Sequence, residues 1–144
     1  MIKLFKGSCL CGGITFEAGD LQADPANCHC RMCRKFHGAA FATLAAAGQF
    51  RWLTGEDLLS HYEGSNGTVR SFCTRCGTSL AFRSNGDAGT PFEIAVSLFD
   101  EDVPIAPAAN IYAKYKADWF SIDESLPVFD EGRTDEQEAE SGAS

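Results

Sequence analysis

The sequence lacks the features of several large protein classes. None of its apolar runs reaches about 18 residues, so it predicts no transmembrane helix. It contains neither a glycine-rich phosphate loop nor a dinucleotide-binding fingerprint, and nothing repeats at a fixed period. Its 144 residues carry a formal net charge of −8 without a basic stripe, which makes a poor nucleic-acid binder. We therefore expect no nucleic acid and no membrane among its partners.

The start of the chain and its cysteines indicate a compartment. Residues 1–13 have no long apolar stretch followed by a small-residue cleavage site, so they predict no signal peptide. The 7 cysteines are odd in number, and none lies outside a tight cluster. Paired cysteines of an exported protein come in even numbers, so we expect a reducing, cytoplasmic location.

Negative charge is concentrated at one end of the chain. Residues 130–144 hold six acidic residues against one arginine and show no apolar period. We expect them to form a disordered acidic tail. Residues 1–129 are expected to form one domain, which is long enough for a hydrophobic core.

Short apolar runs separated by glycines make up most of this domain. The predicted strands are 2–6, 14–17, 39–44, 50–53, 58–62, 68–72, 79–83 and 92–98. Helix is limited to a turn or two at residues 32–37, and residues 106–109 are predicted to be a loop. Strands at this spacing predict a mainly β, antiparallel domain.

The cysteines fall into three motifs with metal-ligand spacing. They are Cys9-x-Cys11, Cys28-x-Cys30-x-x-Cys33 and Cys73-x-x-Cys76. A gap of one or two residues lets two thiolates point at one ion, about 2.3 Å from each. Seven thiolates divide into a closed four-ligand site and a three-ligand site with an open position.

The third motif has the form of a zinc knuckle. Gly77 follows Cys76 and permits a tight turn in which backbone N–H groups face the sulfurs. A knuckle supplies two ligands, and Cys9 and Cys11 are its natural complement. A redox-active pair is the alternative, but such pairs belong in a βαβ context that this sequence lacks.

The central motif can supply three corners of a tetrahedron from one loop. The fourth corner is open to water, substrate or a histidine, and His37 is a better candidate than His29 for a Cys₃His structural site. We expect these histidines to act as hydrogen-bond donors to a thiolate, or alternatively as a general base. A zinc with three thiolates is a modest Lewis acid that suits a thiolate ligand or a carbonyl adduct. That chemistry indicates thiol–carbonyl addition and its reverse, carbon–sulfur cleavage.

Cations surround the cysteine motifs. The residues within four positions of a cysteine include Arg31, Arg34, Lys35, Arg70 and Arg75. They offset thiolate charge, anchor an anionic substrate, or do both.

The three motifs in this order resemble the glutathione-dependent formaldehyde-activating enzyme family, which also includes centromere protein V. The matching segments are 7–13, 28–35, 72–78, 110–112 and 117–127, and the resemblance covers about residues 3–130. It implies curved antiparallel sheets of the β-tent kind with little helix. It also implies that two zinc ions bind per chain. The structural ion would be held by Cys9, Cys11, Cys73 and Cys76, and the catalytic ion by Cys28, Cys30 and Cys33.

The same resemblance implies an activity. Members of the family condense glutathione with formaldehyde to S-hydroxymethylglutathione, a carbon–sulfur lyase reaction. A small thiol such as glutathione is then the expected partner, and Arg31, Arg34 and Lys35 are candidates to bind its two carboxylates. The alternative hypothesis is a non-catalytic zinc module for protein interaction, in which the acidic tail is an interaction segment.

Overall fold

The computed structural model describes residues 1–84 and 92–133, and the chain is mainly β, as the sequence predicts. The strands are β1 (Phe5–Ser8), β2 (Thr15–Leu21), β3 (Ala26–Cys28), β4 (Ala42–Thr54), β5 (Leu59–Glu63), β6 (Val69–Cys73), β7 (Ser79–Arg83), β8 (Phe92–Ala95) and β9 (Ala109–Ile111). The helices of the described residues include α1 (Arg31–His37) and the short 3-10 turns Glu56–Leu58, Val96–Leu98 and Ala113–Tyr115. None of these described helices has the length and apolar character needed to cross a membrane.

The chain folds into two compact units, and each unit is made of two separate stretches. Unit 1 contains Met1–Ala23 and Leu44–Ile105, and unit 2 contains Asp24–Thr43 and Ala106–Ser144. The predicted acidic tail, 130–144, falls mostly outside the described residues, which end at 133. The division into a domain of residues 1–129 and a tail therefore stays a prediction.

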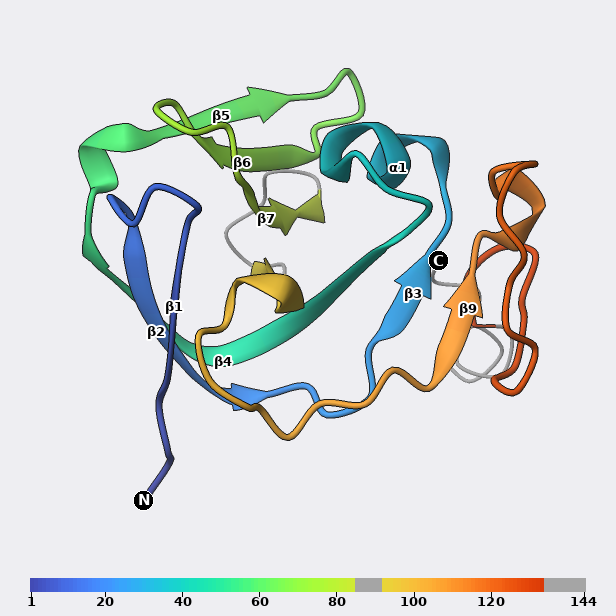
Figure 1. The fold of residues 1–144 in the computed structure, drawn as a ribbon, viewed down its shortest axis with the longest axis horizontal. Coiled ribbons are helices and arrows are strands. Elements are labelled where there is room, and N and C mark those ends of the chain that lie inside the picture. Colours follow the sequence, from blue (N-terminus) through green and yellow to red (C-terminus); the bar gives the residue numbers. More distant parts are fainter. Residues whose placement is uncertain (85–91, 134–144) are drawn as a thin grey trace. The chain divides into compact units, whose positions relative to one another are not determined.

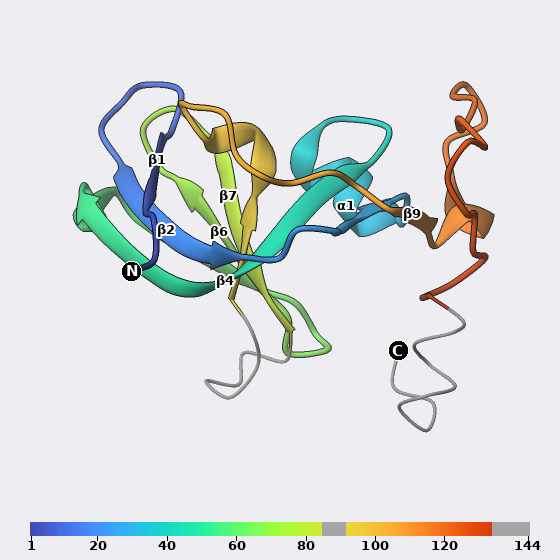
Figure 2. The same cartoon turned by 90° about the horizontal axis from the view of Figure 1, so that it is seen from below.

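Unit 1 is an antiparallel sheet with the strand order β1-β2-β4-β8-β7-β6-β5. β4 is its long central strand, which Figures 1 and 2 show as one continuous curved ribbon. Its first half pairs with β8, from Leu44 to Ala46, and its second half pairs with β2, from Ala47 to Thr54. Each neighbour therefore covers a different part of β4.

The sequence predicts separate strands at 39–44 and 50–53, and this prediction is wrong, because the single strand β4 runs through both segments. Gly48 lies inside β4, and a Cβ atom on it would come within 2.1 Å of the Asp20 carboxylate. Asp20 itself adopts a left-handed conformation with φ 53°. Gly48 therefore allows a close approach between neighbouring strands and does not form a turn.

The core of unit 1 is built from side chains of β2, β7 and β8 and of the loop before β2. The fully buried side chains include Ile14, Phe16, Leu80 and Ile94. The Phe16 ring stacks on Phe50, with the ring centroids 5.3 Å apart. The predicted strand 92–98 is shorter than expected, because the chain leaves the sheet after Ala95 and forms the 3-10 turn.

Unit 2 contains a small sheet that carries the central cysteine motif. β3 pairs with the first two residues of β4 on one side and, in parallel, with β9 on the other. Cys28 is the last residue of β3, and α1 begins three residues later. The sequence missed β3 and β9, because strands of three residues are too short to show an apolar period. Residue 109, predicted to belong to a loop, begins β9.

Candidate metal centres

The first candidate centre lies in unit 1 and joins two hairpin ends. Cys9 and Cys11 lie on the loop between β1 and β2, while Cys73 ends β6 and Cys76 precedes β7. Their four sulfurs all lie within 4.8 Å of one another. The Cys9 and Cys11 sulfurs are 3.6 Å apart, and those of Cys11 and Cys73 are 4.0 Å apart. Sulfurs about 2.3 Å from a tetrahedral ion stand roughly 3.8 Å from each other, so this group fits zinc.

The backbone around these sulfurs is arranged as the knuckle motif predicts. Gly77 has φ 80°, and its N–H donates to the Cys73 carbonyl at 2.8 Å. The Ile14 N–H donates to the Cys9 sulfur at 3.3 Å, and the Arg75 N–H donates to the Cys73 sulfur at 3.4 Å. Backbone N–H groups aimed at sulfur stabilise thiolates, which are the form that binds metal.

Arg75 compensates charge at this centre. Its Nε donates to the Cys11 sulfur at 3.3 Å. A Cβ atom on Gly13 would meet the Arg75 guanidinium at 2.5 Å, so a glycine at this position gives the arginine room. Hydrogen bonds from the Gly13 backbone and then from Arg75 lower the pKa of Cys11. The nearby cations were predicted to offset thiolate charge or to anchor an anionic substrate. The contact of Arg75 with the Cys11 sulfur supports the first role.

The second candidate centre lies in unit 2 and comes from a single loop. The sulfurs of Cys28, Cys30 and Cys33 lie within 4.8 Å of one another. Cys30 caps α1, and its sulfur accepts the N–H of Cys33 at 3.3 Å. Hydrogen bonds from Cys28 and Cys33 lower the pKa of Cys30, while the pKa values of both neighbours are raised. The cluster therefore favours one thiolate first, and three soft sulfur donors suit a zinc ion.

One histidine near this centre, His29, is placed differently from the prediction. Within the described residues, the group that could hold a metal ion here contains three cysteines and no histidine, so His37 is not part of it. His29 does not donate to a thiolate, because its Nε2 donates to Asn110 Oδ1 at 3.0 Å. His29 is 1% exposed, and its Nδ1 is buried without a hydrogen-bond partner. It therefore joins the cysteine loop to β9.

The cations of the central motif have separate environments. The Arg31 guanidinium lies 5.3 Å from the centre of the Tyr115 ring, and Lys35 is exposed. Arg34 Nε is buried and has no hydrogen-bond partner. Arg70 is in unit 1 and stacks 5.4 Å from the centre of the Phe82 ring. Arg34 is thus the cation of this motif with an unused buried donor.

Tyr112 is a residue near the second centre that the sequence did not single out. It has φ 55°, a left-handed conformation that is uncommon for a residue other than glycine. Burial first, and then the charges of the three cysteines and of Glu131, raise the pKa of its phenol. Its N–H donates to the Glu131 carbonyl at 2.7 Å. The only sequence signal was its place in the 110–112 segment that resembles the family.

Comparisons with known proteins give the chain a family. The profile of the glutathione-dependent formaldehyde-activating enzyme family matches residues 4–115, which include all three cysteine motifs. An uncharacterized lyase of Schizosaccharomyces pombe is 27% identical over 126 residues, which make up 87% of this chain and 90% of that protein. The crystal structure of a Rhodobacter sphaeroides protein, a structural genomics target, matches with a TM-score of 0.55 and 27% identity. The match covers 69% of this chain and 91% of that one. The chain belongs to the glutathione-dependent formaldehyde-activating enzyme family.

Proposed function

We propose that the protein is a zinc-dependent carbon–sulfur lyase that acts on adducts of a thiol and an aldehyde. The leading reaction is the condensation of glutathione with formaldehyde to S-hydroxymethylglutathione. The observation that carries this proposal is the group of three sulfurs in unit 2, to which no fourth His, Cys, Asp or Glu of the described residues belongs. Membership in the family and the lyase description of the Schizosaccharomyces pombe relative support the reaction class.

The two cysteine groups have different roles in this proposal. Cys28, Cys30 and Cys33 hold a catalytic zinc, and Cys9, Cys11, Cys73 and Cys76 hold a structural one, which gives two ions per chain. A zinc ion with a free coordination position lowers the pKa of a bound thiol and polarises a carbonyl group. The hydrogen bond between His29 and Asn110 fixes the loop that presents the three sulfurs.

The reaction needs no oxidant or reductant. A carbon–sulfur bond forms between the glutathione sulfur and the formaldehyde carbon as the carbonyl π bond breaks. The thiol loses one proton and the carbonyl oxygen gains one, so the protons balance. The reverse reaction moves one proton from the hydroxyl group back to the sulfur. Glutathione also carries two carboxylates, and we assign Arg34 to one of them, because its buried Nε lacks a partner. Arg31 and Lys35 remain candidates for the other.

The test combines metal analysis with kinetics on the full-length, zinc-loaded chain. We expect two zinc ions per chain and a rate of S-hydroxymethylglutathione formation above that of the uncatalysed addition. X-ray absorption should show sulfur coordination at the second zinc rising when glutathione is added, but not when S-methylglutathione is added. Two equally inert zinc ions and no rate acceleration would favour the non-catalytic zinc module.

Arg34→Ala tests the assignment of the carboxylate anchor. Its glutathione affinity should fall by about tenfold, because one charge-assisted hydrogen bond is lost. Lys3→Ala is the control, since Lys3 is an exposed cation of unit 1 that pairs with Glu101. An Arg34→Ala affinity equal to that of the control would remove Arg34 from the binding site.

A further inference from the structure

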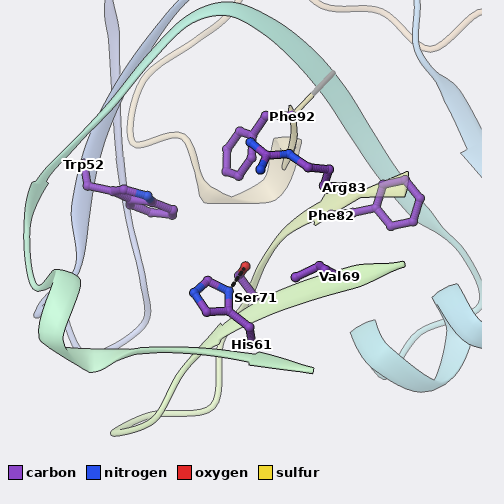
Figure 3. A pocket seen from close by; sticks show the side chains of 7 residues that line it. All are labelled: Trp52, His61, Val69, Ser71, Phe82, Arg83 and Phe92. Atoms are coloured by element: carbon purple, nitrogen blue, oxygen red, sulfur yellow. Dashed lines mark hydrogen bonds between the residues drawn. The ribbon is translucent and has the colours of Figure 1, made fainter. Parts of the chain in front are cut away.

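Unit 1 contains a cavity that the cysteine centres do not use. Its volume is about 200 Å³, and the residues that line it come from the five strands β4, β5, β6, β7 and β8 (Figure 3). Residues that line it include Trp52, His61, Val69, Ser71, Arg83 and Phe92. Pockets for drug-sized ligands measure about 300–1,000 Å³, so this cavity suits a smaller molecule.

The register of the sheet brings these side chains to one face. His61 is paired with Ser71, and Arg83 is paired with both Val69 and Phe92. Paired residues of adjacent strands point to the same side of a sheet, so polar and aromatic groups converge there. Figure 3 shows the Arg83 guanidinium against the Phe92 ring, with Trp52, His61 and Ser71 around the same space.

Arg83 supplies a positive charge and a buried Nε donor that has no hydrogen-bond partner. Its guanidinium lies 5.6 Å from the centre of the Phe92 ring, and its Nε is buried without a hydrogen-bond partner. Among the described residues, no acidic side chain forms an ion pair with it, and Glu63, two strands away in the same row, is exposed. A buried charged donor without an acceptor costs free energy, which an anionic ligand would recover.

Ser71 and His61 add a second polar point opposite this charge. The Ser71 hydroxyl and His61 Nδ1 are 2.7 Å apart. Ser71 is 5% exposed, whereas His61 is exposed, so the pair runs from the sheet interior to the surface. The remaining walls are the apolar faces of Trp52, Phe92 and Val69. A ligand that fits must therefore combine one anionic group with a compact apolar body.

We propose that this cavity binds a small organic carboxylate, with the carboxylate on Arg83 and the apolar body against Trp52 and Phe92. A planar guanidinium matches a carboxylate with two parallel hydrogen bonds. A single arginine between aromatic walls suits a monoanion with an apolar body better than a strongly hydrated dianion. None of the seven cysteines lines the cavity, so this binding is independent of the lyase proposal.

Fluorescence of Trp52 can report this binding. The chain has two tryptophans, and Trp119 is 70% exposed and belongs to unit 2, so a Trp119→Phe background leaves Trp52 as the only reporter. Benzoate, benzyl alcohol and inorganic phosphate are titrated into the zinc-loaded, full-length protein. We expect a saturable change with benzoate and at least about tenfold weaker binding of the other two.

Arg83→Gln should weaken benzoate binding by about ten- to a hundredfold, the effect of losing a charged hydrogen-bond donor. Arg51→Gln is the matched control, since Arg51 lies on β4 and donates to Glu17 at 2.7 Å. Arg83→Lys, which keeps the charge, should lose less affinity than Arg83→Gln. Circular dichroism and zinc content establish that each variant is folded.

Three results would overturn the proposal. They are no saturable change with benzoate, equal binding of benzoate and either of the other probes, and equal benzoate affinity in Arg83→Gln and Arg51→Gln. If Arg83→Gln fails to fold, the comparison of the three probes with Arg83→Lys decides. In that case, the affinities of Arg83→Lys for the three probes are compared. If this variant binds benzoate no more tightly than benzyl alcohol or phosphate, the result counts against the carboxylate site.

Discussion

The two cysteine centres differ in how the chain supplies and surrounds their sulfurs. In unit 1 the ligands come from two segments, and the contacting residues Cys11 and Cys73 are 62 positions apart. In unit 2 all three sulfurs come from one loop at the start of α1. The first group receives N–H bonds from Ile14 and twice from Arg75, whereas in the second the Cys30 sulfur accepts the N–H of Cys33. An ion in the first centre would cross-link the fold, and an ion in the second would be presented by a loop.

The largest expected effect is the loss of the cross-link. Cys73→Ser should lower the free energy of unfolding by about 5 kcal/mol, because the binding free energy of a structural zinc is folding free energy. Thermal denaturation with zinc analysis would measure this change. If Cys73→Ser melts like the wild-type protein, the centre in unit 1 does not stabilise the fold, and the comparison between the two centres fails.

The matched change in unit 2 should affect chemistry more than stability. Cys30→Ser should remove one zinc per chain and lower the rate acceleration by about a thousandfold, which corresponds to about 4 kcal/mol. Its unfolding free energy should fall by only about 1 kcal/mol, since an ion held by residues of one loop cross-links no distant segments. Unchanged zinc content and thiol binding in this variant would show that Cys30 is not a ligand.

Glu93 makes the stability of unit 1 depend on pH. Burial raises its pKa to about 7, so between pH 4.5 and 7 the folded chain holds a proton that the unfolded chain has released. Stability is therefore greatest below the unfolded pKa and declines as pH rises through the folded pKa, by about 3 kcal/mol in total. Glu93→Gln should raise the unfolding free energy by about that amount at pH 8.

Denaturation at about pH 6 and about pH 8 measures this pH dependence. We expect the unfolding free energy to fall by about 1 kcal/mol between these two pH values. The wild-type protein should lose stability across the window, and Glu93→Gln should lose less. Glu124→Gln, an exposed glutamate of unit 2, is the control and should behave as the wild type does. A slope that Glu93→Gln leaves unchanged would assign the pH dependence to other groups.

The smallest expected effect concerns the support of the second centre. Asn110→Ala leaves His29 Nε2 buried without an acceptor and should cost about 1–2 kcal/mol. It should also speed the removal of the second zinc by a chelator, while the first zinc leaves at the wild-type rate. Asn110→Asp keeps an acceptor oxygen and should lose less. Equal chelation rates in all three proteins would contradict a positioning role for this bond.

The local sequence was enough to predict much of the fold and the grouping of thiols. The strand-forming periods at 14–17 and 79–83 and the glycine after Cys76 depend on neighbours in the chain, and the structure has them. Gly48 was misread because its close contact, Asp20, belongs to another strand. His29 was misread for a similar reason, since its partner Asn110 is 81 positions away. Contacts of this kind leave no periodic trace in a sequence.

Each unit is built from two separate stretches of chain, which affects whether a unit can be produced alone or grafted into another protein. β4 has its first two residues in unit 2 and the rest in unit 1, and each unit needs two stretches of chain. No single cut yields either unit whole, and a graft of the 24–43 loop would lack its β9 partner. The whole of residues 24–43 also lies inside the loop that an ion joining Cys11 to Cys73 would close. Binding of that ion would shorten the length of free chain between β3 and its distant partner β9, and so lower the entropy cost of pairing them.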